Sequence, residues 1–273
     1  MADSRSPLAS ATFVGTATTV LRIGDFTLLT DPNFLHAGQR AYLGYGLWTK
    51  RRTEPAFGVE DLPSLDGVLL SHLHGDHFDR VAQHRLPRRL PIVTTRHAER
   101  KLGRRGFRAV VGLPTWKSHE WQKGNQLLRV TAVPGRHGPG PVDWLLPDVM
   151  GSLVDLEVNG ERRLRLYITG DTLYRPTLHE IPQRFPGIDA MLVHLGGTRV
   201  LGLLVTMDAR QGADLVEAIQ PGRTLPIHYD DYGVFRSPLS AFLAEARRRD
   251  LAGIQPITRG ETTPLLAEPA RMR

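Results

Sequence analysis

Short apolar runs separated by turn residues dominate the first third of the chain, and each run predicts a β-strand. The runs lie at residues 11–14, 18–23, 26–30, 67–70 and 91–95. The pair Gly24-Asp25, between the second and third runs, is a turn signal that predicts a hairpin. The fourth run is continuously apolar, which favours a strand buried on both faces. A helical pattern follows at 96–103 and ends at glycine.

The second half of the chain repeats this style, with strands followed by helices. Its predicted strands are 126–133, 151–158, 163–169, 189–194 and 225–228. A helix is predicted at 208–219, where Asp208 is a suitable N-cap. Another is predicted at 237–249, with Ser237 as N-cap and proline in the first position. This order predicts an α/β fold in which two sheets pack face to face and helices cover their outer sides.

The two halves are not separated by a linker-like segment, so we expect a single domain over residues 1–273. Residues 32–63 show no strand or helix pattern. A structureless connection of this length is uncommon unless it is a lid or a binding loop, although an ordinary surface excursion explains it equally well. Trp48 in this segment, and Trp144 further on, could line an acyl-accepting pocket, but core packing is the simpler expectation.

The composition is that of a globular protein, with 41% hydrophobic and 23% charged residues. No apolar run reaches about 18 residues, so no membrane span is expected, and the first residues lack the pattern of a secretory signal. The chain contains no cysteine. Disulfides, thiolate metal ligands and cysteine nucleophiles are therefore excluded, and we expect a cytoplasmic protein.

The formal net charge of +7 raises the question of a polyanionic partner. Basic residues are densest over 84–108, where they would suit a face that binds nucleic acid. Aromatic side chains that could stack on bases are scarce in that stretch. A solvated helix with its flanks is the simpler interpretation, so we do not expect a nucleic-acid partner.

The most specific chemistry is concentrated in the stretch SHLHGDHFDR at 71–80, directly after an apolar run. Imidazole nitrogens and carboxylate oxygens are donors that zinc-like cations prefer. His72 and His74 are one residue apart and can aim at the same ion, whereas Asp76 and His77 can face a second ion. One short stretch cannot complete two sites, so further ligands are expected at the ends of later strands.

Three such residues follow predicted apolar strands. His137 lies in VPGRHG, Asp171 in ITGDT and His228 in PIHYDDY. Each stands at or just after the C-terminal end of its strand, where a sheet can present side chains to one edge. The sequence therefore predicts a metal centre assembled from four segments, in preference to scattered surface histidines and core polar residues.

The order H-x-H-x-D-H, followed by histidine, aspartate and histidine, resembles the metallo-β-lactamase-fold hydrolases. The opening FVGTATTVLRIGDFTLLTDP is similar to the subgroup that contains the ascorbate-6-phosphate lactonase-like proteins and the N-acyl phosphatidylethanolamine phospholipase D. The resemblance covers residues 11–249 and implies a four-layer αββα sandwich. Relatives often carry GHAT near the N-terminus, whereas this chain has threonine at position 16.

Carried over position by position, the resemblance implies two divalent metal ions. The ligands would be His72, His74 and His137 for one ion and Asp76, His77 and His228 for the other, with Asp171 bridging the two. A hydroxide between the ions would be the nucleophile, because shared cationic charge lowers its pKa, and Asp76 would orient it. Nitrogen and oxygen donors suit Zn²⁺, with Mn²⁺ and Fe²⁺ as alternatives.

Several further residues are weaker candidates. Asp31 could orient a ligating imidazole, although an Asp-Pro turn explains it equally well. His194 ends a predicted strand beside the loop that borders the active site in relatives, and Asp230 could protonate a leaving group. The remaining candidates for contact with substrate or ligands are Arg136, Thr198, Arg199 and Tyr229. A structural role is the alternative for each of them.

The expected function is hydrolysis of a small-molecule phosphodiester, lactone or other ester. A ligand set with a bridging carboxylate such as Asp171 resembles that of the dinuclear esterases, lactonases and phosphodiesterases of the superfamily more than that of the true β-lactamases. A metal-dependent nuclease that acts on RNA or DNA is the alternative, but the chain lacks the extra motifs that such members usually carry. The sequence leaves open which substrate is used, which metal is bound and whether the protein forms an oligomer.

Overall fold

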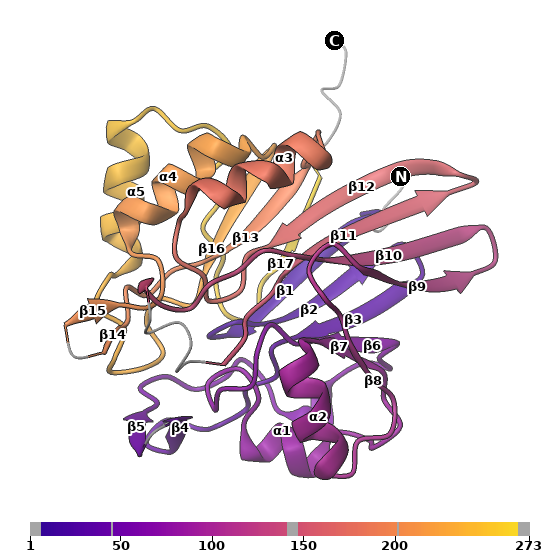
Figure 1. The fold of residues 1–273 in the computed structure, drawn as a ribbon, viewed down its shortest axis with the longest axis horizontal. Coiled ribbons are helices and arrows are strands. Elements are labelled where there is room, and N and C mark those ends of the chain that lie inside the picture. Colours follow the sequence, from indigo (N-terminus) through magenta and orange to yellow (C-terminus); the bar gives the residue numbers. More distant parts are fainter. Residues whose placement is uncertain (1–6, 45, 141–146, 201, 267–273) are drawn as a thin grey trace, which may run out of the picture.

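Two large β-sheets form the centre of the protein in the computed structural model, which describes residues 7–44, 46–140, 147–200 and 202–266 (Figure 1). The first sheet has the strand order β17 (Thr262–Pro264), β1 (Ala9–Gly15), β2 (Thr18–Ile23), β3 (Phe26–Thr30), β6 (Gly67–Leu69), β7 (Ile92–Thr94) and β8 (Val110–Gly112). Strands from β17 to β3 pair antiparallel, and those from β3 to β8 pair parallel. The sheet is therefore mixed.

The second sheet is also mixed. Its strand order is β16 (Arg223–Ile227), β13 (Ala190–His194), β12 (Glu161–Ile168), β11 (Gly151–Val158), β10 (Gln126–Val133) and β9 (Ser118–Lys123). The pairs β16–β13 and β13–β12 are parallel, whereas β12–β11, β11–β10 and β10–β9 are antiparallel. The C-terminal ends of the parallel strands meet at one edge, which is where the predicted metal ligands lie.

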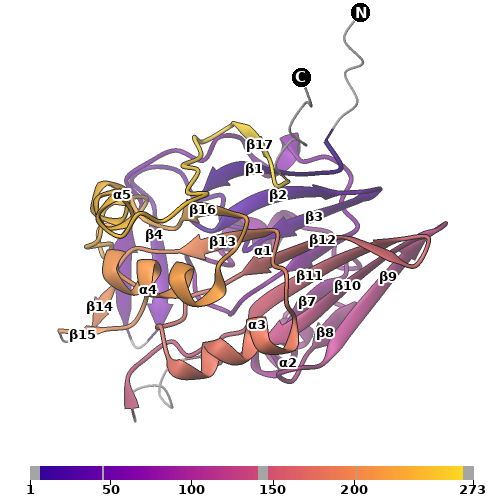
Figure 2. The ribbon, with the colours of Figure 1, turned by 90° about the horizontal axis from the view of Figure 1, so that it is seen from above.

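Helices cover the outer face of each sheet (Figures 1 and 2). Those of the first sheet are α1 (Arg80–Arg85) and α2 (Arg96–Arg104), and those of the second are α3 (Glu180–Arg184), α4 (Ala209–Ile219) and α5 (Leu239–Arg248). Buried residues of α1 and α2 pack against the first sheet, and buried residues of α4 and α5 pack against the second. The predicted arrangement of two mixed sheets between outer helices is confirmed.

The main hydrophobic core lies between the two sheets. Successive residues of a strand point to opposite faces, and β12 shows the consequence. Leu164 and Leu166 enter the core between the sheets, whereas Tyr167 packs under the helices of the second sheet. Leu156 of β11 joins the same central core and has no exposed surface.

The sequence pattern predicts no strand or helix in segment 32–63, but the structure contains both strands and a short helix there. It contains a hairpin of β4 (Arg40–Gly44) and β5 (Leu47–Lys50) and a short 3₁₀ helix, η1 (Val59–Asp61). The hairpin escaped the pattern because its outward side chains are large and apolar: Tyr42, Leu47 and Trp48 are all exposed. Trp48, expected in the core, has 59% of its surface exposed.

Other short elements were also missed because their sequences carry little apolar periodicity. They are β8, β9, the hairpin of β14 (Arg199–Val200) and β15 (Leu203–Leu204), β17, the short helices α1 and α3, and the 3₁₀ helix η3 (Pro176–His179). Trp144 lies outside the described residues. No helix in the described ranges is both long and apolar enough to cross a membrane.

One predicted helix cap is correct and another is wrong. The Asp208 side chain accepts a hydrogen bond from the Gln211 backbone and caps α4 as expected. Ser237 does not cap α5, which begins one residue after Pro238. The Ser237 hydroxyl instead accepts from the Ala209 backbone at 2.9 Å, because the first turn of α4 has its own unsatisfied N–H groups.

Replacement of Leu156 tests the core between the sheets. We expect Leu156→Ala to lower the free energy of unfolding by about 2–5 kcal/mol, because it leaves a cavity in a packed interior. Leu8→Ala is a suitable control, since Leu8 is 38% exposed and its loss should change that free energy by less than about 0.5 kcal/mol. Urea unfolding measures both. Equal effects for the two variants would contradict the assignment of Leu156 to the core.

Candidate metal centre

The predicted ligands come together from four segments, each at the end of a strand. His72, His74, Asp76 and His77 follow β6, and His137, Asp171 and His228 follow β10, β12 and β16. All seven side chains are buried. Their donor atoms form two neighbouring groups, one of three histidines and one of two histidines and two aspartates.

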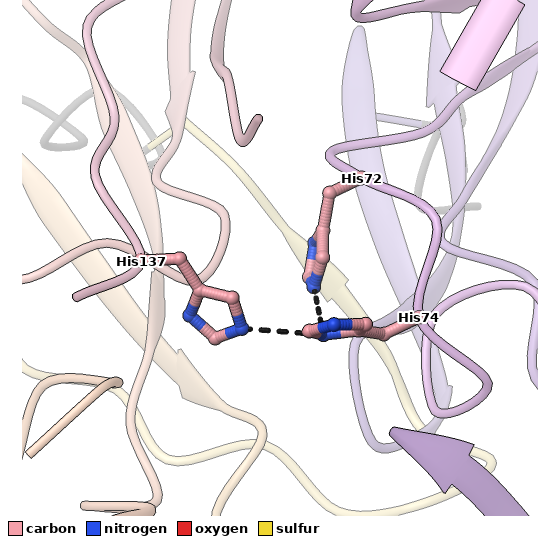
Figure 3. A group of neighbouring side chains, drawn as sticks. All are labelled: His72, His74 and His137. Carbon is pink, nitrogen blue, oxygen red and sulfur yellow. Dashed lines mark hydrogen bonds between the residues drawn. The ribbon is translucent and has the colours of Figure 1, made fainter. Parts of the chain in front are cut away.

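The first group consists of His72, His74 and His137. Nε2 of His72 lies 3.0 Å from Nδ1 of His74, and Nε2 of His137 lies 3.2 Å from the same atom. Figure 3 shows His137 facing the other two from a separate segment. Four donors placed tetrahedrally at about 2.0–2.1 Å from a zinc ion lie about 3.3 Å apart, so this spacing fits three ligands of one ion.

Protonation of the first group also fits metal binding. Burial lowers the pKa of His74 to about 3, and the neighbouring His137 adds to this effect. Burial likewise holds the pKa of His72 well below its ordinary value and lowers that of His137. These imidazoles are therefore neutral near pH 7, which is the form that binds a cation.

The second group consists of Asp76, His77, Asp171 and His228. Nε2 of His77 lies 3.3 Å from Oδ2 of Asp171, and Nε2 of His228 lies 3.6 Å from Oδ2 of Asp76. One atom of each residue is buried without a hydrogen-bond partner: Oδ1 of Asp76, Nε2 of His77, Oδ1 of Asp171 and Nε2 of His228. Orphaned buried donors and acceptors of this kind call for an explanation such as a bound ion. The set therefore fits a divalent cation.

Charge balance separates the second group from the first. Burial alone would lower the pKa of His77, but the carboxylates of Asp171, Asp31 and Asp76 outweigh it and raise that pKa well above its ordinary value. The pKa of His228 is raised for the same reason, chiefly by Asp171. The carboxylates therefore attract positive charge, which protons supply on the histidines when no cation is bound.

Contacts on the far side of each imidazole fix which nitrogen faces the centre. Nδ1 of His137 donates to the Val205 carbonyl, and Nδ1 of His228 donates to the Leu195 carbonyl, both at 2.9 Å. A carbonyl accepts only, so Nδ1 of each ring carries a proton and Nε2 is the nitrogen directed inward, where a cation could bind it. Partners of this type orient metal-binding histidines and increase their basicity.

Asp31 orients His77 in the same way. Its Oδ2 accepts from Nδ1 of His77 at 3.0 Å and from the Ser71 hydroxyl at 2.8 Å, and its Oδ1 accepts from the Ser71 backbone at 2.7 Å. Burial would raise the pKa of Asp31, but His77 and His194 lower it to about 2, so it is ionised. The sequence analysis overlooked Ser71, although this residue opens the stretch 71–80.

His194 lies behind the second group and has no exposed surface. Its ring stacks on His77 with centroids 6.0 Å apart, and its Nε2 lies 3.5 Å from Oδ2 of Asp31. Nδ1 of His194 contacts the Thr169 hydroxyl at 3.2 Å. His194 therefore touches the groups that hold His77, and its position favours an orienting role over contact with substrate.

The other predicted site residues differ in their solvent exposure and in their hydrogen-bond partners. Tyr229 and Thr198 are buried, whereas Arg199 is exposed on β14 and donates to the Gly202 carbonyl. Asp230 is half-exposed and forms an ion pair with Arg259. The backbone N–H of Arg136 donates to the Thr172 hydroxyl at 2.9 Å. Thr206, which the sequence analysis missed, donates its hydroxyl to Oδ2 of Asp171 at 3.2 Å.

A buried ion-pair network is linked to the His228 backbone through hydrogen bonds of Thr16. Nη2 of Arg51 lies 3.3 Å from Oδ1 of Asp231, and neither side chain is exposed. Oδ2 of Asp231 accepts from the Thr16 backbone at 2.7 Å, and the Thr16 carbonyl accepts from the His228 backbone at 2.8 Å. Burial would raise the pKa of Asp231, but Arg259 and Arg51 lower it. Thr16 therefore acts through its backbone.

The chain is similar in sequence to a known family and to proteins from other organisms. The family described as Beta-lactamase superfamily domain matches residues 27–229. The UPF0173 protein YddR of Bacillus subtilis is 28% identical over 174 residues, which cover 62% of this chain and 65% of YddR, slightly under two thirds of its length. A UPF0173 metal-dependent hydrolase of Deinococcus radiodurans is 25% identical over 198 residues, which cover 72% of this chain and 79% of that protein.

Solved structures share the fold over most of the chain. A possible metal-dependent hydrolase from Veillonella parvula is 22% identical with a TM-score of 0.78, covering 94% of this chain and 99% of that one. Isothiocyanate hydrolase from Delia radicum gut bacteria is 20% identical with a TM-score of 0.79, covering 94% and 100%. The metallo-beta-lactamase fold protein YhfI from Bacillus subtilis is 16% identical with a TM-score of 0.58, covering 93% and 98%. Likeness at this identity establishes the fold alone.

Replacement of Asp231 tests the network beneath His228. We expect Asp231→Ala to lower the free energy of unfolding by about 3–5 kcal/mol, because it leaves the buried Arg51 guanidinium without its carboxylate. The neighbouring Asp230→Ala is the control: its carboxylate is 43% exposed, and its loss should lower that free energy by no more than about 1 kcal/mol. Urea unfolding distinguishes the two. A small effect of Asp231→Ala would show that the network does not stabilise this region.

Proposed function

Because the chain belongs to the beta-lactamase superfamily domain family, we propose that it is a metal-dependent hydrolase with a dinuclear centre. The observation that carries the proposal is the pair of buried donor groups, in which the second group leaves four polar atoms without hydrogen-bond partners. The relative from Deinococcus radiodurans is itself named a metal-dependent hydrolase, which agrees with the proposal.

The two donor groups would each hold one ion. The three histidines of the first group would bind the first ion, and Asp76, His77 and His228 would bind the second. Asp171 is suited to lie between them, because its carboxylate interacts electrostatically with His137 of the first group and with His77 and His228 of the second. Zn²⁺ is the first choice for imidazole and carboxylate donors, and Mn²⁺ or Fe²⁺ would also fit.

Two bound divalent ions would polarise a carbonyl or phosphoryl oxygen of the substrate and activate water for attack. The chain's own residues prepare the centre for this role. Val205, Leu195 and Asp31 hold three imidazoles in position, which avoids reorganisation when the substrate binds. Oδ1 of Asp76 is buried without a hydrogen-bond partner and could orient a water molecule.

Further roles follow for the weaker candidates. His194 would act as a positioning residue, because it contacts Asp31 and stacks on His77. Asp230 stays a candidate for the leaving-group acid: burial and the charge of Asp231 raise its pKa, whereas the ion pair with Arg259 opposes this rise. The substrate would be a small-molecule ester, lactone or phosphodiester.

Metal content and a ligand variant test the centre. We expect about two divalent ions per chain, as the two donor groups require, and about one in His137→Ala. That variant should lose more than about 100-fold in kcat/KM, which exceeds the loss expected for a residue that only orients a ligand. His179→Ala, which removes an exposed histidine, should change neither quantity. Metal analysis that finds no bound ion in the purified wild type would contradict the proposal.

A substrate panel separates the proposed function from its nuclease alternative. It would contain an aryl phosphodiester, an aryl ester, a lactone and a short RNA. We expect cleavage of at least one of the first three, and no cleavage in the His137→Ala variant. If only the RNA is cut, and if cutting weakens steeply as salt is added, the basic residues at 84–108 mark a nuclease instead.

A further inference from the structure

A separate cavity lies beside the metal centre, between the hairpin β4–β5 and the helices α1 and α2. Its volume is about 210 Å³, and His74 forms part of its wall. The hairpin that forms part of its wall is attached to the metal-binding loop: the Gly75 N–H donates to the Tyr42 carbonyl at 2.9 Å. A side chain at Gly75 would lie 2.7 Å from the Tyr42 backbone, so only glycine permits this approach. The cavity is therefore fixed against a predicted metal ligand.

Three arginines line this cavity without a carboxylate partner among the described residues. They are Arg40, Arg80 and Arg105. The Arg80 guanidinium donates only to the Arg40 carbonyl at 3.1 Å, and that of Arg105 only to the Gln83 side-chain amide at 3.0 Å. Burial lowers the pKa of Arg105, and no carboxylate offsets this effect. Three exposed arginines that line one cavity without a carboxylate partner among the described residues favour an anionic ligand.

The one carboxylate in the wall cannot neutralise these arginines. Asp79 is buried, and its oxygens accept hydrogen bonds from the Leu35 and Ala82 backbones, both at 2.7 Å. Its role is to cap α1 and to hold the start of segment 32–63. The described wall of the cavity therefore offers these three arginines no carboxylate to pair with.

The hairpin contributes two aromatic rings to the wall of the cavity. Tyr42 and Trp48 are cross-strand neighbours whose ring centroids lie 4.9 Å apart, and they are 44% and 59% exposed. Large exposed aromatic rings beside a cavity suit contact with an apolar or flat ligand. A cavity of about 150 Å³ can hold benzene, so about 210 Å³ is sufficient for one ring with a small anionic group.

We propose that this cavity binds an aromatic anion, with its ring against Tyr42 and Trp48 and its charge on Arg40, Arg80 and Arg105. His74 is shared by the cavity and the first donor group. The ligand is accordingly the anionic, ring-bearing end of the substrate, and the scissile bond lies on the metal side of His74. This last step rests on the proposed hydrolase function, whereas the binding of the aromatic anion does not.

Binding of benzenesulfonate tests the cavity directly, because a sulfonate coordinates metals weakly. Calorimetry on the metal-loaded protein should detect benzenesulfonate and much weaker binding of methanesulfonate or benzyl alcohol, which lack the ring or the charge. The variants Arg80→Gln, Arg105→Gln and Trp48→Ala should each weaken binding at least about fivefold. Arg85→Gln should leave it unchanged, since Arg85 is an exposed arginine of α1 that pairs with Glu60 outside the cavity. Thermal unfolding would verify that the variants are folded.

Kinetics with two aryl esters test the link to the substrate. Arg80→Gln should lower kcat/KM for 4-acetoxybenzenesulfonate at least about fivefold and change that for phenyl acetate by less than about twofold. Equal losses for the two esters would overturn the link to the substrate. Absence of benzenesulfonate binding, or binding that ignores all three variants, would overturn the cavity assignment. Variant-sensitive binding without hydrolysis of either ester would support the cavity and count against the proposed ester hydrolysis.

Discussion

The structure depends on one electrostatic balance, which is the burial of carboxylates and imidazoles together where strands of both sheets end. Asp31, Asp76 and Asp171 have almost no exposed surface. A buried carboxylate is strongly destabilising unless opposite charge or hydrogen-bond donors compensate it. His77 and His228 provide that compensation through their raised pKa values, and two divalent cations would provide it more fully under the proposed function. Rigid strand ends make such crowding tolerable, because they hold the groups in place.

Local sequence signals predicted the central strands and the donor set, since both are encoded over a few residues. The run 126–133 forms β10 with the predicted bounds, and the stretch 71–80 supplies four of the seven gathered donors. Pairing between distant segments was not predictable in this way. Arg51 reads as a surface cation next to lysine and arginine, yet it is fully buried because Asp231 meets it from 180 positions further along the chain. The hairpin β4–β5 was missed because its exposed face is apolar, which is the opposite of the usual pattern.

Three of the seven described non-glycine residues with positive φ angles lie around the donor groups. Thr16, Asp31 and His228 are not glycine, yet their φ angles are 53°, 35° and 61°. Such conformations persist where surrounding contacts over-determine them. Asp31 is held by four hydrogen bonds to Ser71, His77 and the Thr18 hydroxyl, and the backbones of Thr16 and His228 bond to each other. The strained segments therefore set the positions of one orienting carboxylate and one imidazole donor.

The backbone hydrogen bond between Gly75 and Tyr42 separates ligand recognition, on the hairpin β4–β5, from the arrangement of the donor groups. It is made by main-chain atoms only, so it survives when the side chains of β4 and β5 are exchanged. Mutations on that hairpin can accordingly change which molecules are recognised while the reactive groups keep their arrangement. A scaffold with such a division is evolvable: one duplicated copy can acquire a new preference in small steps, and each intermediate protein remains folded and competent.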